Sequence, residues 1–216
     1  MSTRLTLALS LLLILAALIL GAAFWSRLPD PMASHWNARD EVDGYISRFW
    51  GVALMPLIAL GMLGLFLLIP QIDPLKTNIA AFRSTFNLLI FFFTLFLLYL
   101  HILTLLWNLG YRFAMSRMLL PAMGLLFLFI AHLLRRAKRN WFIGIRTPWT
   151  LSSERVWEET HRLGAVLFAV CGLLTIVGGF LGEMLALWFT LGPLVLTSIF
   201  LIVYSYVLYR RETQGK

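Results

Sequence analysis

The residues best spaced for chemistry lie in the segment 135–162. Glu154, Glu158 and His161 fall at positions i, i+4 and i+7, so a helix would place all three on one face. The Glu158-x-x-His161 spacing is the one that helix bundles use for half of a di-metal carboxylate site. The partner half is missing, because outside this segment only two acids, Asp73 and Glu212, are expected on the same side of the fold. We therefore interpret this face as solvated and ion-paired, and keep as the alternative a metal-dependent or hydrolytic enzyme that uses Arg146, Glu158 and His161.

A second polar cluster occupies the segment 26–48. His35 is followed by three carboxylates, the last of them Asp43, and such groups can ligate metal ions. Their spacing does not follow the calcium-loop pattern, and the segment supplies a single imidazole, so we expect no metal site here. The first interpretation is an ordered cap in which Asn37, Asp43 and Gly44 form turns. The second is recognition of a ligand by the same residues.

The sequence contains none of the common catalytic motifs. HExxH, GxSxG, a phosphate-binding P-loop and GxGxxG are all absent. The single cysteine, Cys171, cannot form a disulfide within the chain. We predict a protein that is not an enzyme and that carries neither a cofactor nor a bound metal.

The elements that must position these residues are membrane-spanning helices. Hydrophobic residues make up 60% of the 216-residue chain and charged residues 13%, and the mean hydropathy is +0.84, which excludes an ordinary soluble domain. About 20 apolar residues in a helix cross the hydrocarbon core of a bilayer. Six such segments predict an all-α bundle of six transmembrane helices in one membrane domain, 1–216. The segments are Leu5–Trp25, Phe49–Ile69, Thr85–Trp107, Met118–Leu134, Leu163–Leu181 and Met184–Leu208.

The distribution of basic residues predicts the orientation of the bundle. Thirteen Lys and Arg residues lie on the side that holds both termini and the loop 135–162, and five lie on the other side. Cytoplasmic loops carry such an excess, so we place the N and C termini in the cytoplasm and the loop 26–48 outside. The net charge of +8 is thereby explained without nucleic-acid binding. The four basic residues that follow the fourth span are expected to contact anionic lipids; they are Arg135, Arg136, Lys138 and Arg139.

The positions of the acids argue against an ion-coupled carrier. All ten Asp and Glu residues fall outside the predicted spans, whereas such carriers place carboxylates within their helices. A small-molecule transporter that uses His101, Asn87 and hydroxyl groups is kept as a further alternative. We interpret His101 and His132 as neutral side chains that hydrogen-bond to neighbouring helices.

Local signals predict the structure of the two loops. Pro29 and Pro31 favour extended backbone after the first span, either a short strand or a strap over the bundle. In the loop 135–162, Ser152 or Ser153 can cap a helix that continues directly into the fifth span. On this helix the pairs Glu158 with Arg162 and Arg155 with Glu159 are spaced for ion pairs.

Two stretches resemble a known family. NWFIGIRTPWTLSSERVWEETHRLGA, residues 140–165, resembles the signature of the SdpI family of bacterial membrane proteins. LPDPMASHWNARDEVDG, residues 28–44, is similar to the outer-loop motif of the domain of unknown function that commonly precedes the SdpI domain. The resemblance implies an N-terminal part, 1–69, with the outer loop 26–48, and an SdpI-like part, 116–208, with the cytoplasmic loop 135–162.

The family resemblance also implies a function. It implies a multi-pass protein of the bacterial plasma membrane that confers immunity to a secreted, membrane-active peptide toxin. It further implies a receptor that holds a cytoplasmic transcriptional repressor at the membrane when toxin is present. In the outer loop it points to ligand or signalling residues, which are His35, Asn37, Asp43 and Gly44. In the inner loop it points to signalling or structural residues, which are Asn140, Gly144, Arg146, Thr147, Pro148, Trp149, Trp157, Glu158, His161 and Arg162.

Overall fold

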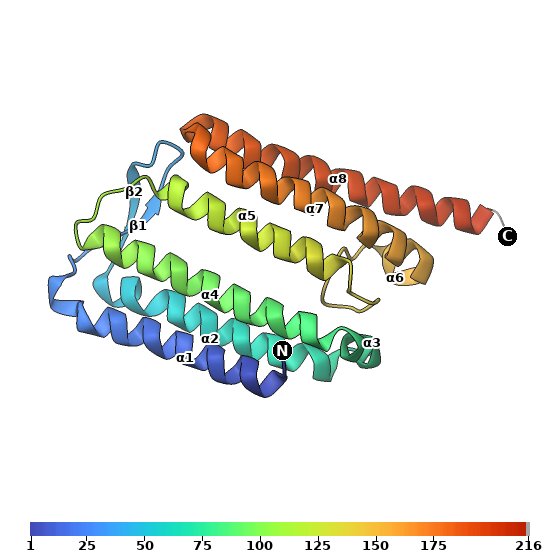
Figure 1. Ribbon diagram of the computed structural model, residues 1–216, viewed down its shortest axis with the longest axis horizontal. Helices are drawn as coiled ribbons and strands as arrows, with labels where there is room; N and C mark the ends of the chain where they lie inside the picture. Colours follow the sequence, from blue (N-terminus) through green and yellow to red (C-terminus); the bar gives the residue numbers. More distant parts are fainter. Residues whose placement is uncertain (215–216) are drawn as a thin grey trace.

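The computed structural model describes residues 1–214, apart from the side chains at positions 183 and 184, and consists mainly of helices (Figure 1). Six of them are long and apolar enough to cross a membrane, which confirms the predicted number of spans and the all-α fold class. They are α1 (Thr3–Ala23), α2 (Arg48–Ile72), α4 (Arg83–Asn108), α5 (Met115–Leu134), α7 (Glu154–Leu181) and α8 (Glu183–Gln214). The shorter elements are a 3₁₀ turn (Trp25–Arg27), the strands β1 (Met32–Trp36) and β2 (Val42–Ile46), and the helices α3 (Lys76–Ala81) and α6 (Pro148–Ser152).

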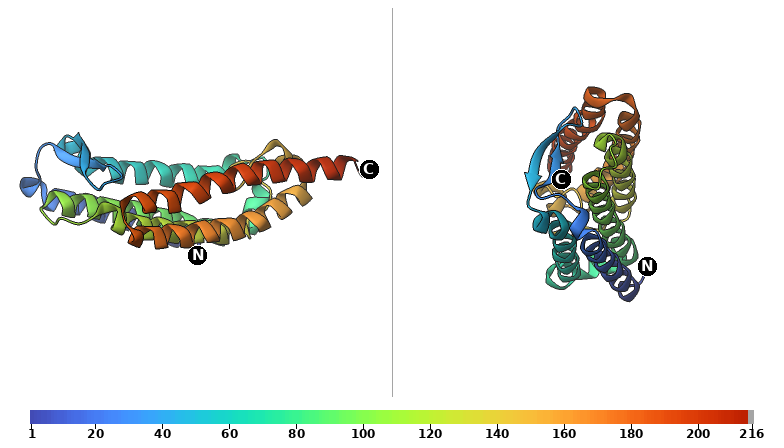
Figure 2. Two further views of the ribbon diagram at one scale, coloured as in Figure 1. Left: turned by 90° about the horizontal axis from the view of Figure 1, so that it is seen from above. Right: turned by 90° about the vertical axis from the view of Figure 1, so that its left-hand side faces the viewer.

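The long helices form two groups of three. Helices α1, α2 and α4 pack on one another, as do α5, α7 and α8, and the two groups meet where α4 packs on α5 (Figure 2). The closest packing is between α5 and α7. A Cβ on Gly124 of α5 would lie 2.5 Å from the carbonyl oxygen of Gly172 on α7, so the missing side chains allow the two backbones to approach.

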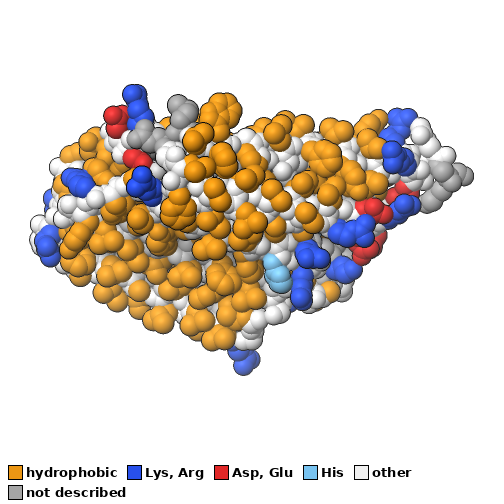
Figure 3. Space-filling view, turned by 45° about the horizontal axis from the view of Figure 1, so that its top comes forward, with side chains coloured by type: hydrophobic (Ala, Val, Ile, Leu, Met, Phe, Trp, Pro, Cys, Tyr) orange, Lys and Arg blue, Asp and Glu red, His pale blue; other side chains and the backbone are white. Residues whose placement is uncertain are grey.

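The two ends of the bundle differ in structure. Both termini lie at the same end as α3 and α6, and the β-hairpin covers the opposite end (Figure 1). Between the ends the surface is apolar, with large exposed side chains such as Leu196 and Leu173, and charged side chains gather toward the ends (Figure 3). This distribution suits helices that face lipid. The cytoplasmic location of the termini stays a prediction.

The segment 26–48, which is predicted to lie outside and is called the outer segment below, contains a two-stranded antiparallel hairpin. Met32 pairs with Ile46 and His35 with Gly44, so the expected extended segment is present and has a second strand beside it. Asn37 forms the turn, as expected, because its side-chain oxygen accepts hydrogen bonds from the backbone N–H groups of residues 39 and 41. Asp43 and Gly44 do not form a turn, contrary to the prediction. They lie in β2, where Gly44 pairs with His35 of β1.

The segment 135–162, which is predicted to be cytoplasmic and is called the inner segment below, contains the start of the predicted helix α7 and the short helix α6, which was not predicted. Ser153 caps α7 by accepting a hydrogen bond from the N–H of Val156, and α7 then continues without a break to Leu181, as expected. The short helix α6 precedes it. Thr147 caps α6 in a capping box and Pro148 occupies its first position, where a missing N–H costs nothing.

Candidate functional site

Asn140 organises the start of the inner loop. Its side chain is fully buried, and the side-chain oxygen accepts hydrogen bonds from the N–H groups of Phe142 (2.9 Å) and Ile143 (2.6 Å). The side-chain amide donates to the carbonyl oxygens of Lys138 and Ile143, each at 2.8 Å. All of the hydrogen-bonding capacity of this amide therefore serves to shape the loop.

Gly144 and His161 form the centre of the loop. Gly144 has a φ of +118°, a conformation that favours glycine, and a Cβ at this position would collide with Nε2 of His161. The N–H of Ile145 donates to Nε2 of His161 at 3.0 Å, and Nδ1 of the same ring donates to the carbonyl oxygen of Trp157 at 2.8 Å. One nitrogen must accept while the other donates, so the buried imidazole is neutral and both of its nitrogens are engaged.

Trp157 links this centre to the end of α5. Its ring is fully buried and stacks on His161, with ring centroids 3.9 Å apart. Its indole N–H donates to the carbonyl oxygen of Ala137 at 2.8 Å. The residue therefore fixes the loop 135–147 against α7 by both packing and hydrogen bonding.

The second half of the loop contacts α8. The hydroxyls of Thr147 and Ser205 lie 3.0 Å apart and share a hydrogen bond, and the rings of Trp149 and Tyr206 pack with centroids 5.1 Å apart. Ser153 donates to the carboxylate of Glu212 at 2.7 Å. The inner loop is thus a folded cap that joins α5, α7 and α8.

The sequence analysis missed the residues that join this cap to the first three-helix group. Asp73, at the end of α2, is buried and accepts a hydrogen bond from the N–H of Trp141 at 2.9 Å. Asn78 of α3 donates to the carbonyl oxygen of Arg139 at 2.8 Å. The only signal in the sequence was an isolated acid directly after an apolar span, which is not specific for such a contact.

In the outer hairpin, three of the four predicted residues lie together. Nδ1 of His35 is 2.5 Å from the carboxylate of Asp43, and a Cβ on Gly44 would lie 2.8 Å from Cβ of His35. The fourth, Asn37, lies in the turn, where its amide donates to Glu41 at 3.0 Å. The His35 and Asp43 side chains are exposed, so this pair is available at the surface of the hairpin.

Three residues attach the hairpin to the bundle. The sequence analysis considered only one of them, Asp40, as one of the three carboxylates that could ligate a metal. Asn108, at the end of α4, exchanges two hydrogen bonds with the backbone of Ala33, at 2.8 and 3.0 Å. The carboxylate of Asp40 accepts from both the N–H and the hydroxyl of Ser116 at the start of α5, at 2.7 and 2.6 Å. The hairpin is therefore held at both three-helix groups.

Comparison with known proteins agrees with this division into two structured ends. Residues 136–205, which contain the inner cap, match the SdpI/YfhL protein family, and residues 12–60, which contain the hairpin, match a domain of unknown function (DUF1648).

The chain carries an SdpI-family domain preceded by a DUF1648 domain.

A relative supports the same assignment over most of the length. Immunity protein SdpI of Bacillus subtilis (strain 168) is 24% identical over 179 residues, which cover 82% of this chain and 84% of that protein. No solved structure matches the chain significantly. The six apolar helices and the SdpI-family domain make it a multi-pass membrane protein, in agreement with the predicted plasma-membrane location.

Within the SdpI domain, the acids of α7 pair differently from the prediction. Glu158 binds Lys138 at 2.9 Å instead of Arg162, and the hydrogen bond that the Lys138 ammonium donates to this carboxylate raises the pKa of Lys138. Arg162 lies 3.7 Å from Glu159, which also pairs with Arg155 at 3.5 Å as predicted. The reason is that the loop 135–140 folds back along α7 and places Lys138 beside Glu158.

The structure does not assemble the alternative cluster of Arg146, Glu158 and His161. Arg146 donates to the carbonyl oxygen of Trp141 at 2.8 Å, Glu158 binds Lys138, and His161 is buried with both nitrogens engaged. The prediction that the whole face is solvated was wrong for His161, because the loop covers it. Among the described residues, no three potential metal ligands lie close enough to hold an ion.

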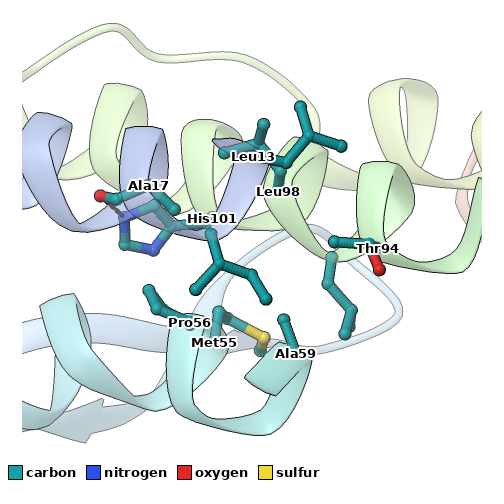
Figure 4. A pocket seen from close by; sticks show the side chains of 10 residues that line it. Leu13, Ala17, Met55, Pro56, Ala59, Thr94, Leu98 and His101 are labelled. Atoms are coloured by element: carbon teal, nitrogen blue, oxygen red, sulfur yellow. Dashed lines mark hydrogen bonds between the residues drawn. The ribbon is translucent and has the colours of Figure 1, made fainter. Parts of the chain in front are cut away.

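His101 lies among α1, α2 and α4 in the DUF1648-bearing half (Figure 4). Its Nε2 is 3.1 Å from the carbonyl oxygen of Ala17 on α1, which confirms the predicted hydrogen bond to a neighbouring helix. A cavity of about 10 Å³ adjoins the ring and is lined by Met55, Pro56 and Thr94 among others. The volume admits at most one water molecule, so the cavity is too small to hold an organic substrate.

Proposed function

We propose that this SdpI-type protein protects its bacterium against a secreted, membrane-active peptide toxin. The observation that carries the proposal is the similarity to an immunity protein over 82% of the chain. The geometry supports a binding protein more than an enzyme, because the polar residues of the inner cap bond to one another and to the backbone. In this proposal the toxin is captured from the hairpin side.

We further propose that the inner cap signals to a cytoplasmic repressor, and that its residues divide into two roles. Asn140, Gly144, Thr147, Trp157 and His161 maintain the shape of the cap, since their side chains or backbone make its internal contacts. The exposed side chains present a surface to the partner. That surface contains Arg146, Trp141, Pro148 and Arg162, with Trp149 partly exposed beside them.

The proposed contact with anionic lipids is narrower than the sequence predicted. Arg135 and Arg136 are exposed at the end of α5 and are available for lipid headgroups. Lys138 is paired with Glu158, and Arg139 donates to the carbonyl oxygen of Leu151 at 2.8 Å. We therefore assign the lipid contact to Arg135 and Arg136.

Survival of toxin-sensitive cells tests the proposal. Cells that express the protein should survive a membrane-active bacterial peptide toxin better than cells with an empty vector.

Three variants test which part of the protein acts. His35→Ala should reduce survival if the His35–Asp43 pair contributes to capture. Arg146→Ala should preserve survival and abolish the transcriptional response. Arg211→Ala, an exposed arginine outside the SdpI domain, is the matched control. Equal killing of wild-type and vector cells, with the protein present in the membrane, would refute immunity.

A further inference from the structure

A cleft of about 360 Å³ lies beneath the outer hairpin, between the starts of α5 and α8. Its volume is within the range of ligand-binding pockets. Its walls are apolar, with Met123 from α5 and Leu187 and Leu191 from α8. Its roof is the hairpin from His35 to Asp40, which is held in place by the two hydrogen bonds between Asp40 and Ser116.

Two of the residues that line this cleft each carry a polar atom with no partner among the described residues. These groups are the indole N–H of Trp36 and the hydroxyl of Thr190, and both atoms are buried. Thr190 as a whole is only 3% exposed, and the ring of Trp36 is held in place by an edge-to-face contact with Trp107, with centroids 5.4 Å apart. A buried donor without a partner is unfavourable, so a ligand with hydrogen-bond acceptors would be stabilised here.

The charges of the cleft indicate the kind of ligand. The described residues that line it include no Lys or Arg, and the ionisable groups among them are Asp40 and His35, which pairs with Asp43. Such a lining does not complement the phosphate of a lipid headgroup. It suits an apolar ligand whose polar groups are uncharged carbonyls or cations, which is the chemistry of a hydrophobic peptide.

We propose that this cleft is the binding site for an apolar segment of a membrane-active peptide, with peptide carbonyls accepting from Trp36 and Thr190. The inference rests on the proposed immunity function and deepens it, because it assigns the place of capture. The cleft differs from the exposed His35–Asp43 pair, which lies at its rim. A peptide would reach it from the outer end or sideways from the lipid.

Photo-crosslinking tests the site directly. The photoreactive residue p-benzoylphenylalanine replaces Leu187, which lines the cleft, and in a matched protein it replaces the neighbouring Trp188, which is 65% exposed and does not line it. The probe is a fluorescently labelled membrane-active bacterial peptide toxin, added to intact cells. The expected result is a labelled adduct from position 187 and little or none from position 188.

Two further variants test the hydrogen bonds. Thr190→Val keeps the volume and removes the hydroxyl, and should reduce the adduct at position 187 several-fold. Thr175→Val on α7 also removes a buried, unpartnered hydroxyl, but one that does not line the cleft, and should leave the adduct unchanged. Equal adducts from both positions, no adduct from position 187, or an adduct indifferent to Thr190→Val would overturn the proposal.

Survival of the same cells separates the site from the function. Protection without an adduct at position 187 would leave immunity standing and refute the cleft as the place of capture. A specific adduct without protection would leave the cleft standing and refute immunity.

Discussion

The backbone N–H of Ile145 donates to Nε2 of His161 across 3.0 Å, directly beside Gly144. This contact joins the loop 135–147 to α7 and requires a residue without a side chain at position 144, because any Cβ there would collide with the same nitrogen. Gly144, the backbone amide of Ile145 and His161 thus depend on one another, and substitutions can test how much each contributes to stability.

Gly144→Ala should destabilise the protein. Alanine must adopt a positive φ, at a cost of about 1–3 kcal/mol, and must also displace His161. The measurement is the thermal unfolding temperature of the purified protein in detergent. Gly182→Ala is the control, since Gly182 has a φ of +97° but no atom within 4 Å of an added Cβ, and it should lower the temperature less. Equal effects would show that the contact with His161 adds nothing.

His161→Phe should destabilise the cap while preserving its packing. The ring fills similar space on Trp157, but the N–H of Ile145 loses its acceptor, at a cost of about 1–3 kcal/mol. Hydrogen exchange of the Ile145 amide should accelerate in this variant. Stoichiometric transition metal in the wild-type protein, lost on this substitution, would instead show that His161 is a ligand and would restore the enzyme alternative.

Thr147 and Ser205 should show energetic coupling. Thr147→Val removes both the cap of α6 and the hydroxyl contact with α8, and Ser205→Ala removes only the contact. In a double-mutant cycle the two changes should deviate from additivity by about 0.5–3 kcal/mol, as groups in contact do. Strict additivity would show that α6 and α8 are held together by other contacts.

The predicted orientation can be tested by labelling of introduced cysteines. Ala38, at the tip of the hairpin, and Ser152, in the inner cap, are both exposed, whereas the native Cys171 is buried and should not interfere. In intact cells a membrane-impermeant maleimide should label a cysteine at position 38 and not one at position 152. The reverse pattern would invert the assigned topology.

The features that could be predicted from the sequence are those that depend on residues close together in the chain. Apolar length determined the six spans, and the residues before Glu154 offered Ser152 or Ser153 as the cap, of which the structure uses Ser153. The contacts that position the loops join residues far apart in the chain, as Asp40 and Ser116 do, and no local pattern reveals them. The burial of His161 was missed for the same reason, because it depends on a loop that folds back over α7.

The measurement that tests the central claim most directly is the toxin concentration that kills half of a sensitive population, compared between cells with this protein and cells with the vector. Immunity predicts a clear increase with the wild-type protein, and the proposed place of capture predicts that Thr190→Val reduces this increase whereas Thr175→Val does not. An unchanged killing concentration, with the protein inserted in the membrane at a normal level, would contradict the immunity function.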